Sequence, residues 1–253
     1  MIILFDMTGN ELVKKYCEGV EDLFEENSFK LNVQFSNVQV PCYRTNGTHK
    51  IIMLPEAIES ITFDEHNLDI EFLTLIALSH ETAHYLNEHN KIKEETLDLG
   101  IELWADFFGG KILFTLFLNS KFFKERYCFF KSPNELIENY YEGLCKVYEH
   151  YYSIVNENYP SKELRIQIGL TASTSVFSYF TNNLYNEYSI LAVRTFSKNQ
   201  NFTMDKYERT EKELETIYPT IIEVHSKIIG EDKFISKNMK EEYLKYITTA
   251  YKK

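Results

Sequence analysis

The sequence predicts an α+β fold that is mainly α-helical, with a small N-terminal β-sheet and a helical C-terminal half. Alternating apolar and polar residues in LNVQFSNVQV predict a strand, and Asn46-Gly47 between extended segments is typical of a hairpin turn. After Pro55 the apolar residues recur at helical spacing instead. With 253 residues and 44% hydrophobic content, the chain can bury a large core.

The first expected helix covers residues 10–26, where apolar residues recur at helical spacing behind Asn10, a residue type that often caps helices. The strands and the hairpin follow it. The next helix, residues 68–87 (LDIEFLTLIALSHETAHYLN), is expected to be largely buried because it is mostly apolar. After the polar connector NEHNKIKEET, the run LDLGIELWADFFGGKILFTLFL predicts a second central helix.

The second half of the chain is expected to be mostly helical, since apolar spacing continues there between punctuating Pro, Asn and Gly residues. The expected helices are residues 133–157, 161–182, 205–228 and 231–251. No repeat or flexible linker divides the sequence. We therefore expect one domain over residues 1–253, with the sheet and the two central helices in 1–120 and a helical lobe in 121–253.

Composition and charge narrow the range of partners. The formal net charge of -11 and the lack of a Lys/Arg stripe argue against nucleic acid and favour a protein or peptide partner. The longest apolar run, residues 112–118, is far shorter than the ~20 residues of a membrane span. The first residues lack the features of a secretory signal, and the four cysteines are widely spaced, so we expect a cytoplasmic protein with reduced thiols.

Residues 79–89, SHETAHYLNEH, contain three of the seven histidines. Within them, residues 80–84 form the motif H-E-x-x-H. On a helix, His80 and His84 lie one turn apart on the same face, so both imidazoles can reach one ion. Neutral histidine nitrogen suits zinc, and Glu81 beside the ion can take a proton from metal-bound water. The motif therefore predicts a hydrolytic zinc centre.

A catalytic zinc site needs a third protein ligand besides its water. The pattern H-E-x-x-H-x-x-G-x-x-H is excluded, because Asn87 and Asn90 occupy its glycine and third histidine positions. Glu102 lies 18 residues beyond His84 on the next predicted helix, which leaves room for a turn and a return. We expect Glu102 to complete a site for one zinc per chain, with His89 and Glu95 as the next candidates.

Asp106 follows Glu102 by one helical turn, on the same face. It could accept the N–H of a ligating histidine and so fix its tautomer. Apolar neighbours on both sides make an exposed pair of acids awkward at this place. Gly109-Gly110 would let the two central helices approach closely, although ordinary packing explains these glycines equally well.

The motifs H-E-x-x-H-x-x-x-x-H at residues 80–89 and E-x-x-A-D-x-x-G at residues 102–109 resemble those of gluzincin peptidases of the HtpX and CaaX-protease type. The resemblance implies a zincin-like fold, with zinc held by two histidines and the glutamate and with Glu81 as general base. Those peptidases are membrane proteins. Soluble peptidases of similar layout, of the Lit and ImmA types, make cleavage of a cytosolic protein the closer analogy.

The resemblance extends to residues 159–166, YPSKELRI, which are similar to the family segment H-P-x-x-x-x-R-I. Tyrosine replaces the histidine. Hydrolysis creates an oxyanion, and hydrogen-bond donors that meet it are worth roughly 3 to 4 kcal/mol each. We expect Tyr159 and Arg165 to supply such donors, although a Tyr-Pro helix start and a surface arginine are also ordinary structural features.

These observations predict a zinc metallopeptidase of the gluzincin type that cleaves an intracellular protein substrate, with an extended peptide paired to a strand within Thr48–Leu54. Two alternatives stay open. The protein could bind zinc without turnover, as a regulatory or protein-interaction module. It could also be an interaction module whose acidic helical half recognises a partner and whose H-E-x-x-H motif is coincidental.

Overall fold

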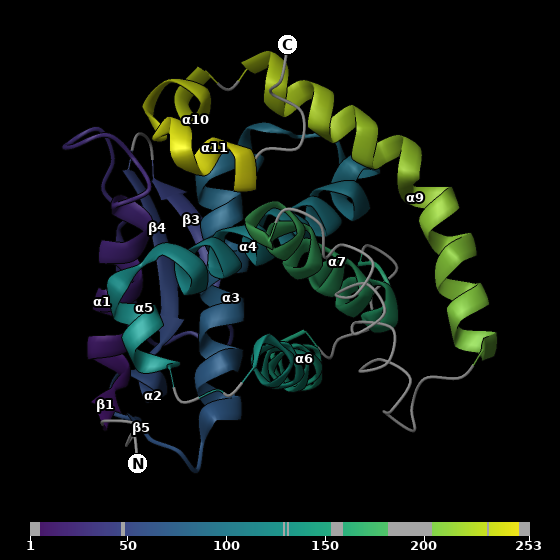
Figure 1. Cartoon of the computed structure of the whole chain (residues 1–253). Coiled ribbons are helices and arrows are strands. Elements are labelled where there is room, and N and C mark those ends of the chain that lie inside the picture. The colour runs from purple at the N-terminus through teal and green to yellow at the C-terminus, as the bar shows by residue number, and fades with distance from the viewer. Residues whose placement is uncertain are drawn as a thin grey trace.

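The computed structural model describes residues 6–46, 49–128, 130, 132–152, 159–181, 204–231 and 233–247. Within these residues the protein is mainly α-helical with a small region of β-sheet, which confirms the predicted α+β class (Figure 1). None of the described helices has the length and apolar character that crossing a membrane requires.

The strands form two small sheets. In the larger sheet, β2 (Val33–Ser36), β3 (Cys42–Asn46) and β4 (His49–Pro55) lie in the order β2-β4-β3. In the smaller one, β1 (Met7–Thr8) pairs with β5 (Thr62–Phe63). β3 and β4 are antiparallel, so the strands of the predicted hairpin are confirmed, while its turn lies outside the described residues.

The position of β4 contradicts the strand predicted to bind substrate. The sequence predicts that a peptide pairs within Thr48–Leu54, but β4 is already paired with β2 on one side and with β3 on the other. The pairing of β2 with β4 is parallel, and local alternation in the sequence carries no information about such a crossover. This sheet therefore leaves β2 and β3, and not β4, as edge strands.

The first helix, α1 (Gly9–Glu21), differs from its prediction at both ends. Its N-cap is Thr8 and not Asn10, because Thr8 and Glu11 form a reciprocal capping box. The Thr8 Oγ1 atom accepts from the Glu11 N–H at 3.3 Å, and Glu11 Oε2 accepts from the Thr8 N–H at 2.8 Å. Two reciprocal bonds fix the start of the helix more firmly than a single asparagine cap.

The central helices match their predictions closely. α3 (Leu68–Asn87) covers the predicted range, and α4 (Asp98–Asn119) ends one residue beyond the apolar run. The connector between them contains two short 3₁₀ helices, η1 (His89–Lys91) and η2 (Glu95–Leu97). A short helix, α2 (Glu56–Glu59), precedes β5.

The later helices follow the predicted ones with changed boundaries, except that the short helix α5 was not predicted. They are α5 (Lys121–Arg126), α6 (Pro133–His150), α7 (Lys162–Thr181), α9 (Met204–Glu231), α10 (Lys233–Asn238) and α11 (Glu241–Ile247). The predicted helix 231–251 is instead divided between α10 and α11, where Met239 forms an isolated β-bridge with Phe24. Predicted helical residues 153–157, 182, 232 and 248–251 lie outside the described residues.

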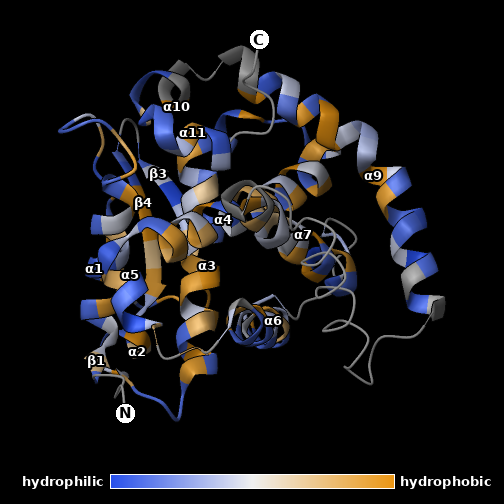
Figure 2. Cartoon of the chain, in the orientation of Figure 1, coloured by the Kyte–Doolittle hydropathy of each residue, from blue (hydrophilic) through white to orange (hydrophobic). Residues whose placement is uncertain are grey.

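α3 lies at the centre of the fold, where the larger sheet packs on one side of it and α6 on the other (Figure 1). α4 packs against α3 and also contacts α7 and α9. Both central helices carry mostly apolar residues, whereas α9 is largely hydrophilic (Figure 2). A Cβ atom on Gly109 would lie 2.7 Å from the Ser79 carbonyl oxygen, so the glycine permits the close approach of α4 to α3.

Candidate metal centre

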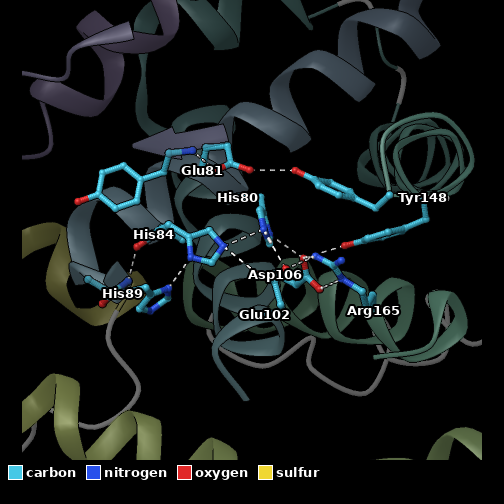
Figure 3. Close-up of polar contacts among 12 residues, drawn as sticks. His80, Glu81, His84, His89, Glu102, Asp106, Tyr148 and Arg165 are labelled. Atoms are coloured by element: carbon cyan, nitrogen blue, oxygen red, sulfur yellow. Dashed lines mark hydrogen bonds and ion pairs between the residues drawn. The ribbon is translucent and has the colours of Figure 1, made fainter. Parts of the chain in front are cut away.

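The two central helices bring His80, His84 and Glu102 together (Figure 3). The Nε2 atoms of His80 and His84 lie 2.9 Å apart. The Glu102 carboxylate approaches these Nε2 atoms at 3.4 Å from His80 and 3.6 Å from His84. One potential ligand atom from each residue lies within 4.8 Å of the others, so the group could hold a metal ion.

The site is buried but retains some access to solvent. His80 is only 4% exposed, whereas the side chains of His84 and Glu102 are 12% and 15% exposed. A catalytic metal site needs a buried side that fixes its ligands and an open coordination position that water and substrate can reach. The exposed part of this group therefore lies on the side of His84 and Glu102.

His80 is supported by Asp106, as the sequence predicts. The His80 Nδ1 atom lies 2.8 Å from Asp106 Oδ1. An ionised carboxylate only accepts hydrogen bonds, so Nδ1 carries the proton and the Nε2 lone pair can face a metal. Burial would raise the pKa of Asp106, but the charge of Arg165 and the bond from His80 outweigh it and lower that pKa.

Asp106 is held in turn by Tyr148 and Arg165. The Tyr148 hydroxyl donates to Asp106 Oδ1 at 2.8 Å, and Arg165 donates from Nε to Oδ2 at 2.7 Å and from Nη2 to Oδ1 at 3.0 Å. Arg165 Nη2 also donates to Glu102 Oε2 at 3.1 Å. Arg165 is 2% exposed. It therefore positions both carboxylates from a buried place in the protein.

Electrostatics favour a cation between these residues. Glu102 and Asp106 are two buried carboxylates with one guanidinium, Arg165, between them. Burial would raise the pKa of Glu102, but the hydrogen bond from His80 and the neighbouring positive charges outweigh it and lower that pKa. The guanidinium balances one carboxylate, and in the metal-free protein the proton of His80 balances the other, so a metal cation that replaces this proton would meet two nitrogen ligands and one oxygen ligand.

The two histidines of the motif titrate in opposite directions. Burial would lower the pKa of His80, but its hydrogen bonds to Asp106 and Glu102 raise it to about 10. Burial and the charge of His80 lower the pKa of His84 to about 4. His84 is therefore neutral at pH 7. A bound metal cation would replace the His80 proton that faces Glu102, because either positive charge can pair with the Glu102 carboxylate.

Glu81 lies beside this group and is held at both carboxylate oxygens. Its Oε2 accepts the backbone N–H of Tyr43 in β3 at 2.7 Å, and its Oε1 accepts the hydroxyl of Tyr152 at 3.0 Å. Burial raises the pKa of Glu81 to about 7, while the charge of His80 opposes this shift. A carboxylate with this pKa can both take up and release a proton near neutral pH.

The remaining predicted residues lie in different places. The ring centre of Tyr159 is 6.0 Å from the Arg165 guanidinium carbon, but Tyr159 is 46% exposed. Glu95 is exposed in η2 and lies outside the group. His89 is buried against His84 and is not among the converging ligand atoms. Tyr159 and Arg165 as oxyanion donors stay predictions.

Sequence reasoning assigned no role to Tyr43, Tyr148 or Tyr152. Tyr148 lies in the last turn of α6 and Tyr152 lies two residues beyond its end, and their rings are 5.9 Å apart, as a four-residue helical spacing would also predict. Both rings also cover Arg165, with centres 4.7 and 5.0 Å from its guanidinium carbon. That spacing was a usable signal, whereas Tyr43 acts through its backbone and leaves no trace in the sequence.

Comparisons with protein-family models, curated proteins and solved structures gave no match to this chain. The centre is thus defined by its own chemistry. It combines two imidazoles and a carboxylate that converge on one point, the hydrogen-bonded carboxylate of Glu81 beside them, and the ion pair of Asp106 with Arg165 behind His80.

Proposed function

We propose that this protein is a zinc metallopeptidase of the gluzincin type, with a zincin-like arrangement of sheet and motif helix. The observation that carries the proposal is the placement of Glu81, a buried carboxylate fixed by two hydrogen bonds beside a possible three-ligand metal group. Two histidine nitrogens and one glutamate oxygen are a ligand set typical of zinc peptidases. The ligands would be His80, His84 and Glu102.

Bound zinc would supply Lewis acidity that activates water toward a pKa of ~7 and polarises the scissile carbonyl. Glu81 accepts the proton of the attacking water and later delivers it to the leaving amine. Its bonds to Tyr43 and Tyr152 hold the carboxylate in the orientation that both transfers need. Asp106 keeps the proton of His80 on Nδ1, so that Nε2 remains available as a ligand.

The oxyanion needs a donor close to the base. The Tyr152 hydroxyl lies 3.0 Å from Glu81 Oε1, whereas the guanidinium of Arg165 bonds to Asp106 and Glu102. Once Glu81 has taken up the proton of the water, it no longer needs the single O–H of Tyr152, which can then turn toward the oxyanion. We therefore add Tyr152 to Tyr159 and Arg165 as an oxyanion donor, and we favour it.

The substrate is proposed to be a protein segment in extended conformation. β3 is an edge strand of its sheet, and its Tyr43 N–H bonds to Glu81, so this edge passes directly beside the base. A peptide added along β3 would present its backbone to the metal group while alternate side chains point away from the sheet. This replaces the pairing predicted for Thr48–Leu54.

Glu81→Gln separates an enzyme from a zinc-binding module without turnover. The amide keeps the shape of the side chain but cannot accept the proton, so turnover should fall by at least ~10²-fold while zinc content stays unchanged. The matched control is Glu65→Gln, because the Glu65 side chain is 69% exposed. Cleavage is measured with a mixed peptide library and by new protein termini in cells that express each variant.

Equal cleavage by the wild type and Glu81→Gln would reject Glu81 as the base. A zinc-loaded wild type that cleaves no library peptide and creates no new protein termini would favour the non-catalytic module. A wild type without zinc would favour the interaction module with a coincidental motif.

A further inference from the structure

His89 is a buried histidine whose ring makes a single hydrogen bond within the described residues. It is 4% exposed, and its Nδ1 atom lies 2.8 Å from the Nδ1 atom of His84 (Figure 3). The two rings are nearly perpendicular, with centres 4.7 Å apart and an interplanar angle of 86°. The other ring nitrogen of His89, Nε2, has no hydrogen-bond partner in the described part of the chain. Among the described residues, the His89 ring is therefore held by one hydrogen bond, the contact with His84.

The turn after α3 fixes this contact. Glu88 ends the helix in the left-handed conformation, with φ of 50°, and so turns the chain back toward the last helical turn. Lys50 and Lys91 form ion pairs with Glu88. On the other side of His89, Asn90 accepts the Tyr43 hydroxyl at 2.9 Å. His89 is thus anchored through both of its chain neighbours.

The direction of the hydrogen bond follows from the ligand role of His84. Its Nε2 atom faces His80 and Glu102, so a metal bound there needs the Nε2 lone pair. A neutral imidazole with a free Nε2 carries its proton on Nδ1. That proton then points at His89 Nδ1, which must accept it. His89 must consequently hold its own proton on Nε2.

We propose that His89 is a positioning residue of the metal centre, which fixes the tautomer and the ring orientation of His84 by accepting its Nδ1–H. The inference rests on the proposed metal site. It gives His84 a neutral partner where His80 has a carboxylate. Partners of this kind are worth about 10- to 100-fold in metal affinity.

Two substitutions at His89 separate this role from simple packing. His89→Leu fills similar space without an acceptor, and we expect it to weaken zinc binding about 10-fold or more. His89→Asn is smaller, but its amide oxygen can stand near the position of Nδ1, so we expect affinity within about 3-fold of wild type. Zinc dissociation constants are measured by competition with a chromophoric chelator.

The tautomer gives a second test that needs no variant. In the zinc-loaded wild type, ¹⁵N-resolved NMR of the imidazoles should show His89 protonated on Nε2 and bare on Nδ1, and His84 protonated on Nδ1. A proton on His89 Nδ1 would overturn the proposal. So would equal losses of affinity in the Leu and Asn variants, which would assign His89 to packing.

Failure of the proposed function has a different signature. A wild type that binds no zinc would overturn the metal site and this inference together. A wild type that binds zinc, with an unchanged affinity in His89→Leu, would overturn the inference alone and leave the metal site intact.

Discussion

His80 and His84 lie one turn apart on α3, yet the protein supports them in different ways. His80 rests on Asp106, which bonds to Tyr148 and Arg165 from two further helices, so this side is charged and closed. His84 rests on the neutral ring of His89, which lies in a short turn. His80 is thus built into the core, whereas His84 is held by a local segment near the more exposed side.

Because the two supports differ, we expect their removal to lower the stability of the protein by different amounts. Removal of Asp106 would leave the charge of Arg165, which is 2% exposed, with Glu102 as its remaining carboxylate partner. Removal of His89 would leave one neutral nitrogen of His84 unpaired. A buried charge that loses one of its two carboxylate partners costs more than an unpaired neutral group.

Asp106→Ala should therefore have the largest effect. We expect the metal-free variant to lose about 3 to 5 kcal/mol of unfolding free energy, because a buried ion pair is broken on one side. Metal affinity and activity should fall with it. Urea unfolding of metal-free protein measures the first effect, and zinc titration measures the second. Wild-type stability in Asp106→Ala would break the comparison, since Arg165 would then not need this partner.

The same variant predicts a change in pH dependence. The pKa of Asp106 is lowered in the folded protein, so its stabilisation is present above the pKa of an unfolded aspartate. It is lost as the pH falls through the lowered folded value. Metal-free wild type should lose this part of its stability in acid, and Asp106→Ala should lack it. Parallel stability curves for the two proteins would contradict the assignment.

The next largest effect is expected on kcat, from substitution of Tyr152. Tyr152→Phe removes the hydroxyl that bonds to Glu81, and we expect kcat to fall by about 10²-fold with zinc content retained. Tyr159→Phe is the matched control, because Tyr159 is 46% exposed and we expect a loss below about 10-fold. The reverse order would assign the oxyanion to Tyr159, as the sequence predicts.

Much of this site follows from local patterns. H-E-x-x-H on one helix, and Glu102 and Asp106 one turn apart on the next, predict the contacts that the structure shows, because helical spacing fixes which side chains share a face. The bounds of α3 follow in the same way from its apolar run. Gly109 was ambiguous in the sequence and acquires its reason from the backbone of Ser79.

The rest depends on contacts between distant segments. Tyr43 reaches Glu81 through a backbone N–H, and Arg165 reaches Asp106 from 59 residues away. The parallel pairing that buries β4 also needs a crossover that no local pattern specifies. The sequence predicts His89 only as an alternative ligand, because spacing predicts proximity but not which ring nitrogen faces the proposed metal.

The zinc content of the purified protein tests the central claim most directly. Wild type, dialysed against metal-free buffer, should retain about one zinc per chain, as a three-ligand site requires. Glu102→Gln, which removes the carboxylate charge, should bind zinc about 10- to 100-fold more weakly than the wild type. A wild type without zinc, or Glu102→Gln with undiminished affinity, would contradict a metal centre built from His80, His84 and Glu102.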